Sequence, residues 1–223
     1  MSTQVFAPPQ LVLFDLDGTL VDSAPDMYAA LLALCAEHGG KAADFSAVRE
    51  LVSRGAMAVL RSSFPGRDDA ALRELVPRYL AIYAERLAAE SGLFEGIGEL
   101  LDRLEARAIA WGIVTNKPGF LAEPLLVQLG LRPRLASLVA GDTLPQRKPD
   151  PAPLLHACRE AGIAPADTIY VGDDLRDVEA ARNAGMRVIA VAWGYLNGSD
   201  PCDWQADAVA NDVADLARQL GVS

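Results

Sequence analysis

Short apolar runs alternate with stretches of helical spacing over most of the chain. Residues 11–14 (Leu-Val-Leu-Phe) form a run that is too short for a helix and predicts a buried parallel strand. Further strands are expected at 109–114, 138–140, 169–171, 187–191 and 208–210. Helices are expected at 97–104, 121–129, 152–161, 178–184 and 213–220. This alternation predicts an α/β fold with a doubly wound parallel sheet, similar to a Rossmann fold.

The stretch after the first strand has a different pattern, because its apolar residues recur only at helical spacing. A helix should begin near Asp22 or Ser23, either of which could cap it, and should end at Gly39. Two further amphipathic segments, 51–64 and 72–87, contain no convincing strand. We therefore expect a helical cap domain at 21–91 and a core domain made of 1–20 and 92–223.

One predicted core helix contains a proline. Pro124 falls within 121–129. A proline has no backbone N–H to donate and is tolerated in a helix mainly in the first turn. The pattern therefore predicts that Pro124 lies in the first turn of this helix.

Composition narrows the class of protein. The chain has 223 residues, of which 51% are hydrophobic and 22% charged, a balance typical of a globular protein with one core and a small accessory domain. A net charge of −10 disfavours binding to nucleic acid or to an anionic membrane. No apolar stretch reaches the ~18 residues of a membrane span. Residues 1–10 lack a basic residue and do not resemble a signal peptide.

The cysteines and histidines do not indicate a metal site. The three cysteines lie far apart in the sequence, and the two histidines are isolated. We therefore expect reduced thiols and a cytoplasmic location. Whether the protein is a monomer or a homodimer stays open.

Polar residues follow three of the predicted strands. Asp15 follows the first, Thr115 and Asn116 follow the second, and Asp173 comes just after the run at 169–171. Lys148 lies in a proline-rich loop before a helix. Because ligands bind beyond the carboxyl ends of parallel strands, these side chains should gather at one edge of the sheet.

The first acidic pair offers two chemical roles. Of Asp15 and Asp17, one carboxylate could attack phosphorus and the other could exchange a proton with the leaving oxygen. Gly18 allows the backbone to turn tightly beside an anion. An ordinary Asp-Gly turn after a strand would produce the same local pattern.

A second acidic cluster contains Asp173, Asp174 and Asp177. Carboxylates of this kind hold Mg²⁺ together with phosphate oxygens. Acidic residues also favour helix N-termini without binding any metal. Simple helix capping could likewise explain Thr115 and Asn116, and an exposed surface position could explain Lys148.

Taken together, these motifs resemble the haloacid dehalogenase superfamily in both order and spacing. They are residues 15–20, Thr115, residues 148–151 and residues 172–177. The resemblance extends over nearly the whole chain, and the helical insert is similar to the cap that this superfamily carries between its first and second motifs. It implies a magnesium-dependent phosphatase with a small phosphorylated metabolite as its partner.

The resemblance also implies residue roles. Asp15 would be the nucleophile and a metal ligand, and Asp17 the general acid and base, binding metal through its carbonyl oxygen. Thr115, together with Asn116, and Lys148 would bind the phosphate. Asp173 would complete the metal site, with Asp174 and Asp177 around it.

The substrate is less defined by these motifs. The chain resembles the phosphoglycolate phosphatase type, and several core segments, such as 111–118 and 171–177, are similar to the N-acetylmuramic acid 6-phosphate phosphatases of cell-wall recycling. Arg54, in a cap loop, could pair with a substrate carboxylate. It could equally be a surface arginine at a helix start.

Three other functions compete with hydrolysis of a phosphate ester. A dehalogenase needs neither Asp17 nor a metal site, and both are expected here. A non-catalytic relative should have lost one of Asp15, Asp17, Lys148 or Asp173, yet all are present. A sugar phosphomutase shares the core residues and stays an alternative.

Overall fold

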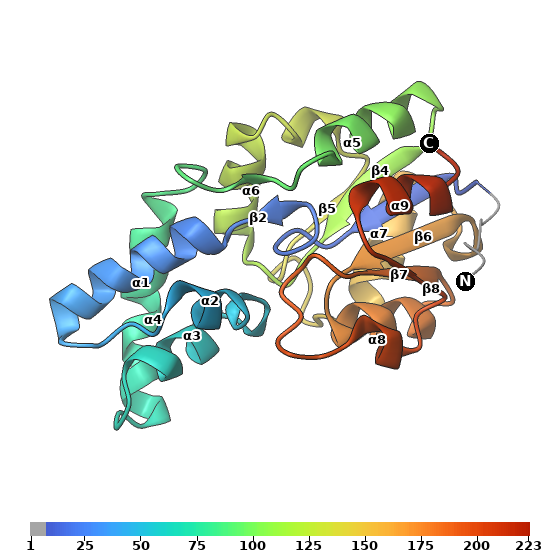
Figure 1. Ribbon diagram of the computed structural model, residues 1–223. Coiled ribbons are helices and arrows are strands. Elements are labelled where there is room, and N and C mark those ends of the chain that lie inside the picture. Colours follow the sequence, from blue (N-terminus) through green and yellow to red (C-terminus); the bar gives the residue numbers. More distant parts are fainter. Residues whose placement is uncertain (1–7) are drawn as a thin grey trace.

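A six-stranded parallel sheet forms the core of the computed structural model, which describes residues 8–223 (Figure 1). The expectation about residues 1–10 therefore lies mostly outside the described residues. The strand order is β5-β4-β1-β6-β7-β8, and every pairing is parallel, which confirms the predicted α/β fold. The strands are β1 (Leu11–Phe14), β4 (Ala110–Val114), β5 (Leu138–Val139), β6 (Thr168–Gly172), β7 (Arg187–Val191) and β8 (Ala208–Ala210).

Strand β1 lies in the middle of the sheet, between β4 and β6. All four of its residues are fully buried, as expected for a parallel strand covered on both faces. Phe14 is in register with Ile113 of β4 and with Val171 of β6. The three strands therefore end side by side, and the residues that follow them share one edge of the sheet.

Helices cover both faces of the sheet (Figure 1). They are α5 (Ile97–Ala106), α6 (Gly119–Gln128), α7 (Ala152–Ala161), α8 (Leu175–Asn183) and α9 (Val213–Gln219). The predicted place of Pro124 is wrong: α6 begins at Gly119, directly after Pro118, so Pro124 lies in the second turn. The helix there forgoes one backbone hydrogen bond.

Short 3-10 helices lie in the core connections; they are η2 (Arg132–Arg134), η3 (Pro165–Asp167) and η4 (Pro201–Trp204).

The helices of residues 24–84 gather at one end of the molecule, away from most of the sheet (Figure 1). They are α1 (Ala24–His38), α2 (Phe45–Arg49), η1 (Val52–Arg54), α3 (Ala56–Ser63) and α4 (Asp69–Ala84). The expectation of helices without a strand from about 45 to 90 holds up to Ala84, where α4 ends, and turns follow over 85–90. We refer to this group as the cap, and its domain bounds stay a prediction.

A small antiparallel ribbon lies where the chain enters and leaves the cap. Strand β2 (Val21–Asp22) pairs with β3 (Gly92–Leu93), and neither was predicted.

Ser23 occupies the expected N-cap position of α1, but its hydroxyl does not cap the helix. It donates instead to Asp17 Oδ1 at 2.6 Å. Helix α1 ends as expected, with Gly39 at a φ of 72°.

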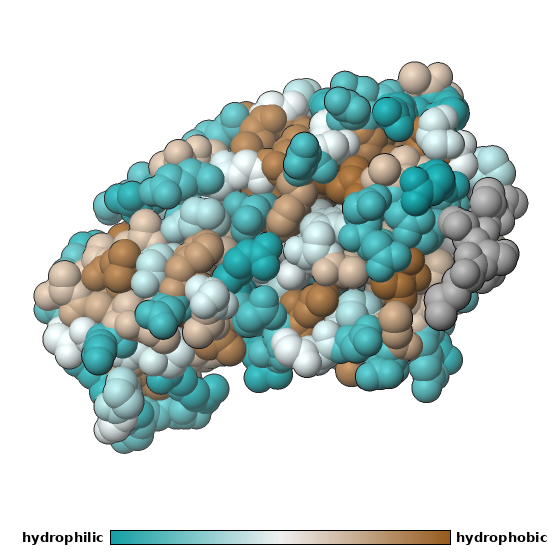
Figure 2. Space-filling view, in the orientation of Figure 1, coloured by the Kyte–Doolittle hydropathy of each residue, from teal (hydrophilic) through white to brown (hydrophobic). Residues whose placement is uncertain are grey.

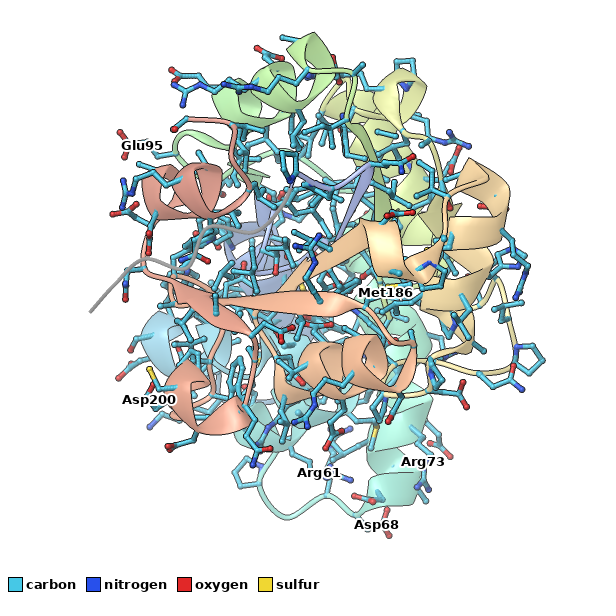
Figure 3. The ribbon with its side chains drawn as sticks, turned by 90° about the vertical axis from the view of Figure 1, so that its right-hand side faces the viewer. Arg61, Asp68, Arg73, Glu95, Met186 and Asp200 are labelled. Atoms are coloured by element: carbon cyan, nitrogen blue, oxygen red, sulfur yellow. The ribbon has the colours of Figure 1, made fainter. Side chains whose placement is uncertain are left out.

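The distal end of the cap is charged. Figure 3 shows Arg61, Asp68 and Arg73 together at the lower end of the molecule, and Arg61 pairs there with Asp69.

The face of the molecule in Figure 2 is mixed, because hydrophilic residues surround smaller hydrophobic patches. Within residues 8–223, no helix combines the length and the apolar character needed to cross a membrane.

Candidate active site

Asp15 lies directly after β1, at the edge of the sheet that faces the cap. Its Oδ1 atom accepts a hydrogen bond from the backbone N–H of Leu16 at 2.8 Å, which fixes the carboxylate against the turn. The ammonium group of Lys148 lies 2.9 Å from the same oxygen. The nucleophile candidate is therefore oriented by its own backbone and charge-paired with a lysine from a distant loop.

Lys148 is almost fully buried and links two carboxylates. Its Nζ atom lies 2.7 Å from Asp177 Oδ1 and donates to the Tyr170 hydroxyl at 2.8 Å. Burial acts to lower the pKa of Lys148, but Asp15 and Asp177 act in the opposite direction, and the net shift is upward. The ammonium group therefore stays charged at the centre of the site.

Asn116 holds the loop that carries Lys148. Its side-chain amide donates to the carbonyl oxygen of Lys148 at 3.0 Å and accepts from the Lys148 backbone N–H at 3.1 Å. This two-way contact joins the end of β4 to the lysine loop. Asn116 was predicted to bind phosphate, and its contacts in the structure are with this loop.

Asp173 is fully buried beside Asp15. Its carboxylate accepts from the Thr19 hydroxyl and from the Tyr195 backbone N–H, both at 2.8 Å. Burial, followed by the negative charge of Asp15, raises the pKa of Asp173 well above its ordinary value. A β-carbon on Gly18 would overlap this carboxylate, so glycine is needed for the close approach.

The acidic cluster suits a hard divalent cation. One carboxylate oxygen from each of Asp15, Asp173 and Asp177 lies within 4.8 Å of the others. Oxygen donors of this type are those that Mg²⁺ prefers, whereas a site without histidine or cysteine ligands suits zinc poorly. Burial raises the pKa of Asp177 to about 7 even though Lys148 acts against the shift. Three crowded, buried carboxylates fit a role as cation ligands.

Asp174 and Asp177 also shape the start of α8. Asp174 is its N-cap, and the two side chains form a reciprocal capping box. Asp174 also pairs with Arg176 at 2.8 Å, and this pairing lowers the pKa of Asp174 although burial acts to raise it. Arg176 in turn donates to the carbonyl oxygen of Ser53 in the cap. Asp174 therefore caps α8, as the alternative interpretation predicted, and its partner Arg176 links the core to the cap.

Asp17 is held by groups from both parts of the molecule. Lys117 Nζ lies 2.9 and 3.1 Å from its two carboxylate oxygens, and the Ser23 hydroxyl donates to Oδ1. The same ammonium group donates to the Tyr83 hydroxyl of α4 at 2.8 Å. Lys117 is buried, and the sequence analysis assigned it no role.

A cavity of about 110 Å³ lies between the cap and this edge of the sheet. Asp15, Asp17, Thr115 and Lys148 line its floor, so the structure brings together the residues predicted from separate motifs. Cap residues supply an apolar wall; these are Met27, Val52, Ala56 and Leu80. Thr115 is buried, and its hydroxyl accepts from the Lys117 backbone N–H at 3.2 Å.

Arg54 does not line this cavity. Its side chain is exposed and lines a neighbouring surface groove, which shares Asp174 and Arg176 with the cavity. Arg176 lines the cavity itself, at the seam between core and cap. The structure therefore places Arg54 in one groove with Asp174, but outside the cavity that Asp15, Asp17 and Lys148 line.

Several residues of the site were missed by the sequence analysis. They are Thr19, Tyr83, Lys117, Tyr170, Arg176 and Tyr195. Lys117 and Arg176 stand close to predicted residues, so their proximity in sequence could have indicated them. Tyr83 and Tyr195 reach the site only through long-range packing, and no local pattern indicates them.

Comparison with known proteins gives this arrangement a family. The model of the haloacid dehalogenase-like hydrolases matches residues 12–191. A phosphoglycolate phosphatase of Xanthomonas campestris pv. campestris (strain 8004) is 47% identical, over 93% of this chain and 95% of that protein. An N-acetylmuramic acid 6-phosphate phosphatase of Pseudomonas putida is 43% identical, over 94% and 95%.

A solved structure agrees with these relatives. The crystal structure of a predicted phosphoglycolate phosphatase from Haemophilus somnus 129PT superposes with a TM-score of 0.84 at 27% identity, covering 95% of this chain and 97% of that one. The chain belongs to the haloacid dehalogenase-like hydrolases. Within that family, its relatives indicate a phosphoric monoester hydrolase.

Proposed function

We propose that this protein hydrolyses a small phosphorylated metabolite with Asp15 as nucleophile, Mg²⁺ as cofactor and Asp17 as general acid and base. One observation carries the proposal: Lys148 Nζ lies 2.9 Å from Asp15 Oδ1 inside a buried, three-carboxylate cluster at the floor of a cavity. Attack of one anion on another needs neutralised charge. Lys148 supplies part of it.

The proposed reaction has two displacements. Asp15 attacks phosphorus, the ester P–O bond breaks, and the departing oxygen takes a proton from Asp17. Asp17, now a carboxylate, removes a proton from water, whose oxygen attacks the phospho-aspartate. The bond between phosphorus and Asp15 then breaks, which releases inorganic phosphate and restores both aspartates. The net reaction consumes one water and yields one alcohol and one phosphate.

The other residues position the phosphoryl group. Thr115 would donate its hydroxyl to a phosphoryl oxygen, and Lys148 would stay between Asp15 and the transferred group. Asp15, Asp173 and the backbone carbonyl oxygen of Asp17 would hold the cation, with Asp177 beside them. When bound, Mg²⁺ supplies positive charge against the nucleophile and the phosphate.

We infer that the substrate is N-acetylmuramic acid 6-phosphate. The apolar wall of the cap, which includes Met27, Val52 and Leu80, suits the methyl groups of the acetamido and lactyl substituents. A relative that carries this name in Pseudomonas putida is 43% identical. The assignment would place the protein in cell-wall recycling.

A second candidate is 2-phosphoglycolate. The cavity volume of about 110 Å³ is small beside the ~300–1,000 Å³ of typical ligand pockets. A two-carbon substrate suits a cavity of this size better than a hexose phosphate does. The relative at 47% identity carries the name of this activity.

The test is to measure inorganic phosphate release from both substrates with Mg²⁺, using Asp15→Asn as the blank. Hydrolysis of the muramic substrate with kcat/KM at least ~100-fold higher, about 2.7 kcal/mol of differential transition-state binding, supports our assignment. The opposite preference supports phosphoglycolate. Phosphate release no faster than the blank with either compound would contradict both and favour a phosphomutase.

A further inference from the structure

A buried polar cluster joins the cap to the core beside the site. It consists of Ser23, Tyr83, Asp17 and Lys117, and we call it the hinge cluster. Ser23 precedes α1, and Tyr83 lies near the end of α4, so both belong to the cap side. Asp17 and Lys117 follow β1 and β4 of the core sheet.

The contacts within the hinge cluster are short. Lys117 Nζ binds both carboxylate oxygens of Asp17 and donates to the Tyr83 hydroxyl, at distances between 2.8 and 3.1 Å. The ammonium group also lies 4.6 Å from the centre of the Tyr83 ring, a cation–π distance. The ammonium therefore contacts the core carboxylate and the cap tyrosine at the same time.

Burial makes this arrangement costly to break. The Lys117 side chain is 4% exposed, and Asp17 is the one acidic residue within ion-pair distance of it among residues 8–223. A buried ammonium group without a partner carries a large desolvation penalty. Displacing α4 would remove Tyr83, one of the two partners that fix the position of the ammonium group.

We propose that Lys117 is a positioning residue for Asp17, and that the Tyr83 hydroxyl makes this positioning depend on the seating of the cap. The inference rests on the proposed role of Asp17 as general acid. Through Lys117, the carboxyl group of Asp17 is directed toward the departing oxygen only when α4 lies against the core. The cap thus contributes to proton transfer through Tyr83, in addition to enclosing the substrate.

The test compares two leaving groups in four proteins: the wild type, Lys117→Met, Tyr83→Phe and Tyr79→Phe. Tyr79 is a matched control, because it is buried in the same helix and its hydroxyl donates to the Met27 carbonyl within the cap, at 3.1 Å. One substrate is N-acetylmuramic acid 6-phosphate or 2-phosphoglycolate, whichever the wild type hydrolyses faster. Its leaving group is an alkoxide, which needs protonation. The other is p-nitrophenyl phosphate, whose leaving group does not.

The readout is kcat/KM, which covers the steps up to departure of the leaving group. Lys117→Met should lose about 100-fold on the alkyl phosphate and under about 10-fold on p-nitrophenyl phosphate, since general acid catalysis contributes ~10²–10⁴. Tyr83→Phe should lose about 10-fold on the alkyl phosphate and less on p-nitrophenyl phosphate. Tyr79→Phe should show no difference between the two substrates.

Equal losses on both substrates, or equal behaviour of Tyr83→Phe and Tyr79→Phe, would overturn the proposal. If Lys117→Met does not fold, Tyr83→Phe and Lys117→Arg decide, and Lys117→Arg should recover part of the lost alkyl phosphate activity. An inactive wild type would instead refute the proposed function, so the two failures are distinguishable.

Discussion

Gly18 shows how a single residue makes the acidic cluster possible. It has a φ of 85°, a conformation that favours glycine, and a β-carbon there would overlap the Asp173 carboxylate and approach the Tyr195 ring. Gly39 has a similar φ of 72°, but a β-carbon there meets open space. The two glycines therefore share the backbone requirement and differ in what surrounds them.

We expect Gly39→Ala to lower the free energy of unfolding by about 1 kcal/mol through backbone strain alone. Gly18→Ala should cost roughly 2–4 kcal/mol and weaken Mg²⁺ binding, because Asp173 must move. Thermal unfolding and Mg²⁺ titration of both variants measure this difference. Similar Mg²⁺ affinity in the two variants would argue against a role for Gly18 in shaping the cluster.

At the scale of elements, Asp26 ties together the two chain segments that connect cap and core. It is fully buried near the start of α1, and its carboxylate accepts from the backbone N–H groups of Glu90 and Ser91 and from the Ser91 hydroxyl, at distances between 2.6 and 3.0 Å. These bonds fasten the returning chain just before β3. The ribbon of β2 and β3 is too short to do this alone.

Asp26→Ala should therefore reduce the free energy of unfolding by roughly 3 kcal/mol, since it leaves buried donors without a partner. Limited proteolysis should cut the variant faster near residues 85–92. Asp68→Ala serves as a control: it removes the exposed N-cap of α4 and should cost about 1 kcal/mol without that change in cleavage. Unchanged proteolysis of Asp26→Ala would show that the ribbon holds without it.

Most elements were predictable because their signals are local. Strand β1 is a short apolar run between Gln10 and Asp15, and β7 is a short run rich in β-branched residues. Helix α7 has a regular helical spacing with Gly162 at its end. Strands β2 and β3 are two residues long, so they carry no period that could be detected. The start of α6 was placed too late because Pro124 was assigned to its first turn.

The candidate site likewise contains residues that local signals predict and residues that only long-range packing brings in. Asp15, Thr115 and Asp173 follow predicted strands, and parallel strands end at one edge, so their meeting could be foreseen. The contact of Tyr83 with Lys117 depends on how α4 packs against the core, which no local spacing encodes. Arg54 was predicted from its place in a cap loop and from the carboxylate of both candidate substrates, and neither fixes where its side chain points.

For the whole molecule, the buried acidic cluster opposes folding unless its charge is balanced. Asp15, Asp173 and Asp177 converge, and Lys148 offsets only part of their charge. A divalent cation that binds the folded chain alone stabilises it by about 2.7 kcal/mol at 100 times its Kd. We expect Mg²⁺ at that level to raise Tm by roughly 5–10 °C.

The matched variant is Asp173→Asn, which removes one charge from the cluster at nearly constant volume. Its Tm should respond little to Mg²⁺, and its metal-free stability should equal or exceed that of the unchanged protein. A full Mg²⁺ response in this variant would place the cation elsewhere.

The central claim is that phosphate passes through Asp15. The most direct measurement is mass spectrometry of the enzyme quenched during turnover with Mg²⁺ and the better carboxylated substrate. We predict one phosphoryl group on the peptide that contains Asp15, and none on Asp15→Asn. Phosphate release with Asp15 unmodified throughout, or with the phosphoryl group on another residue, would contradict the account.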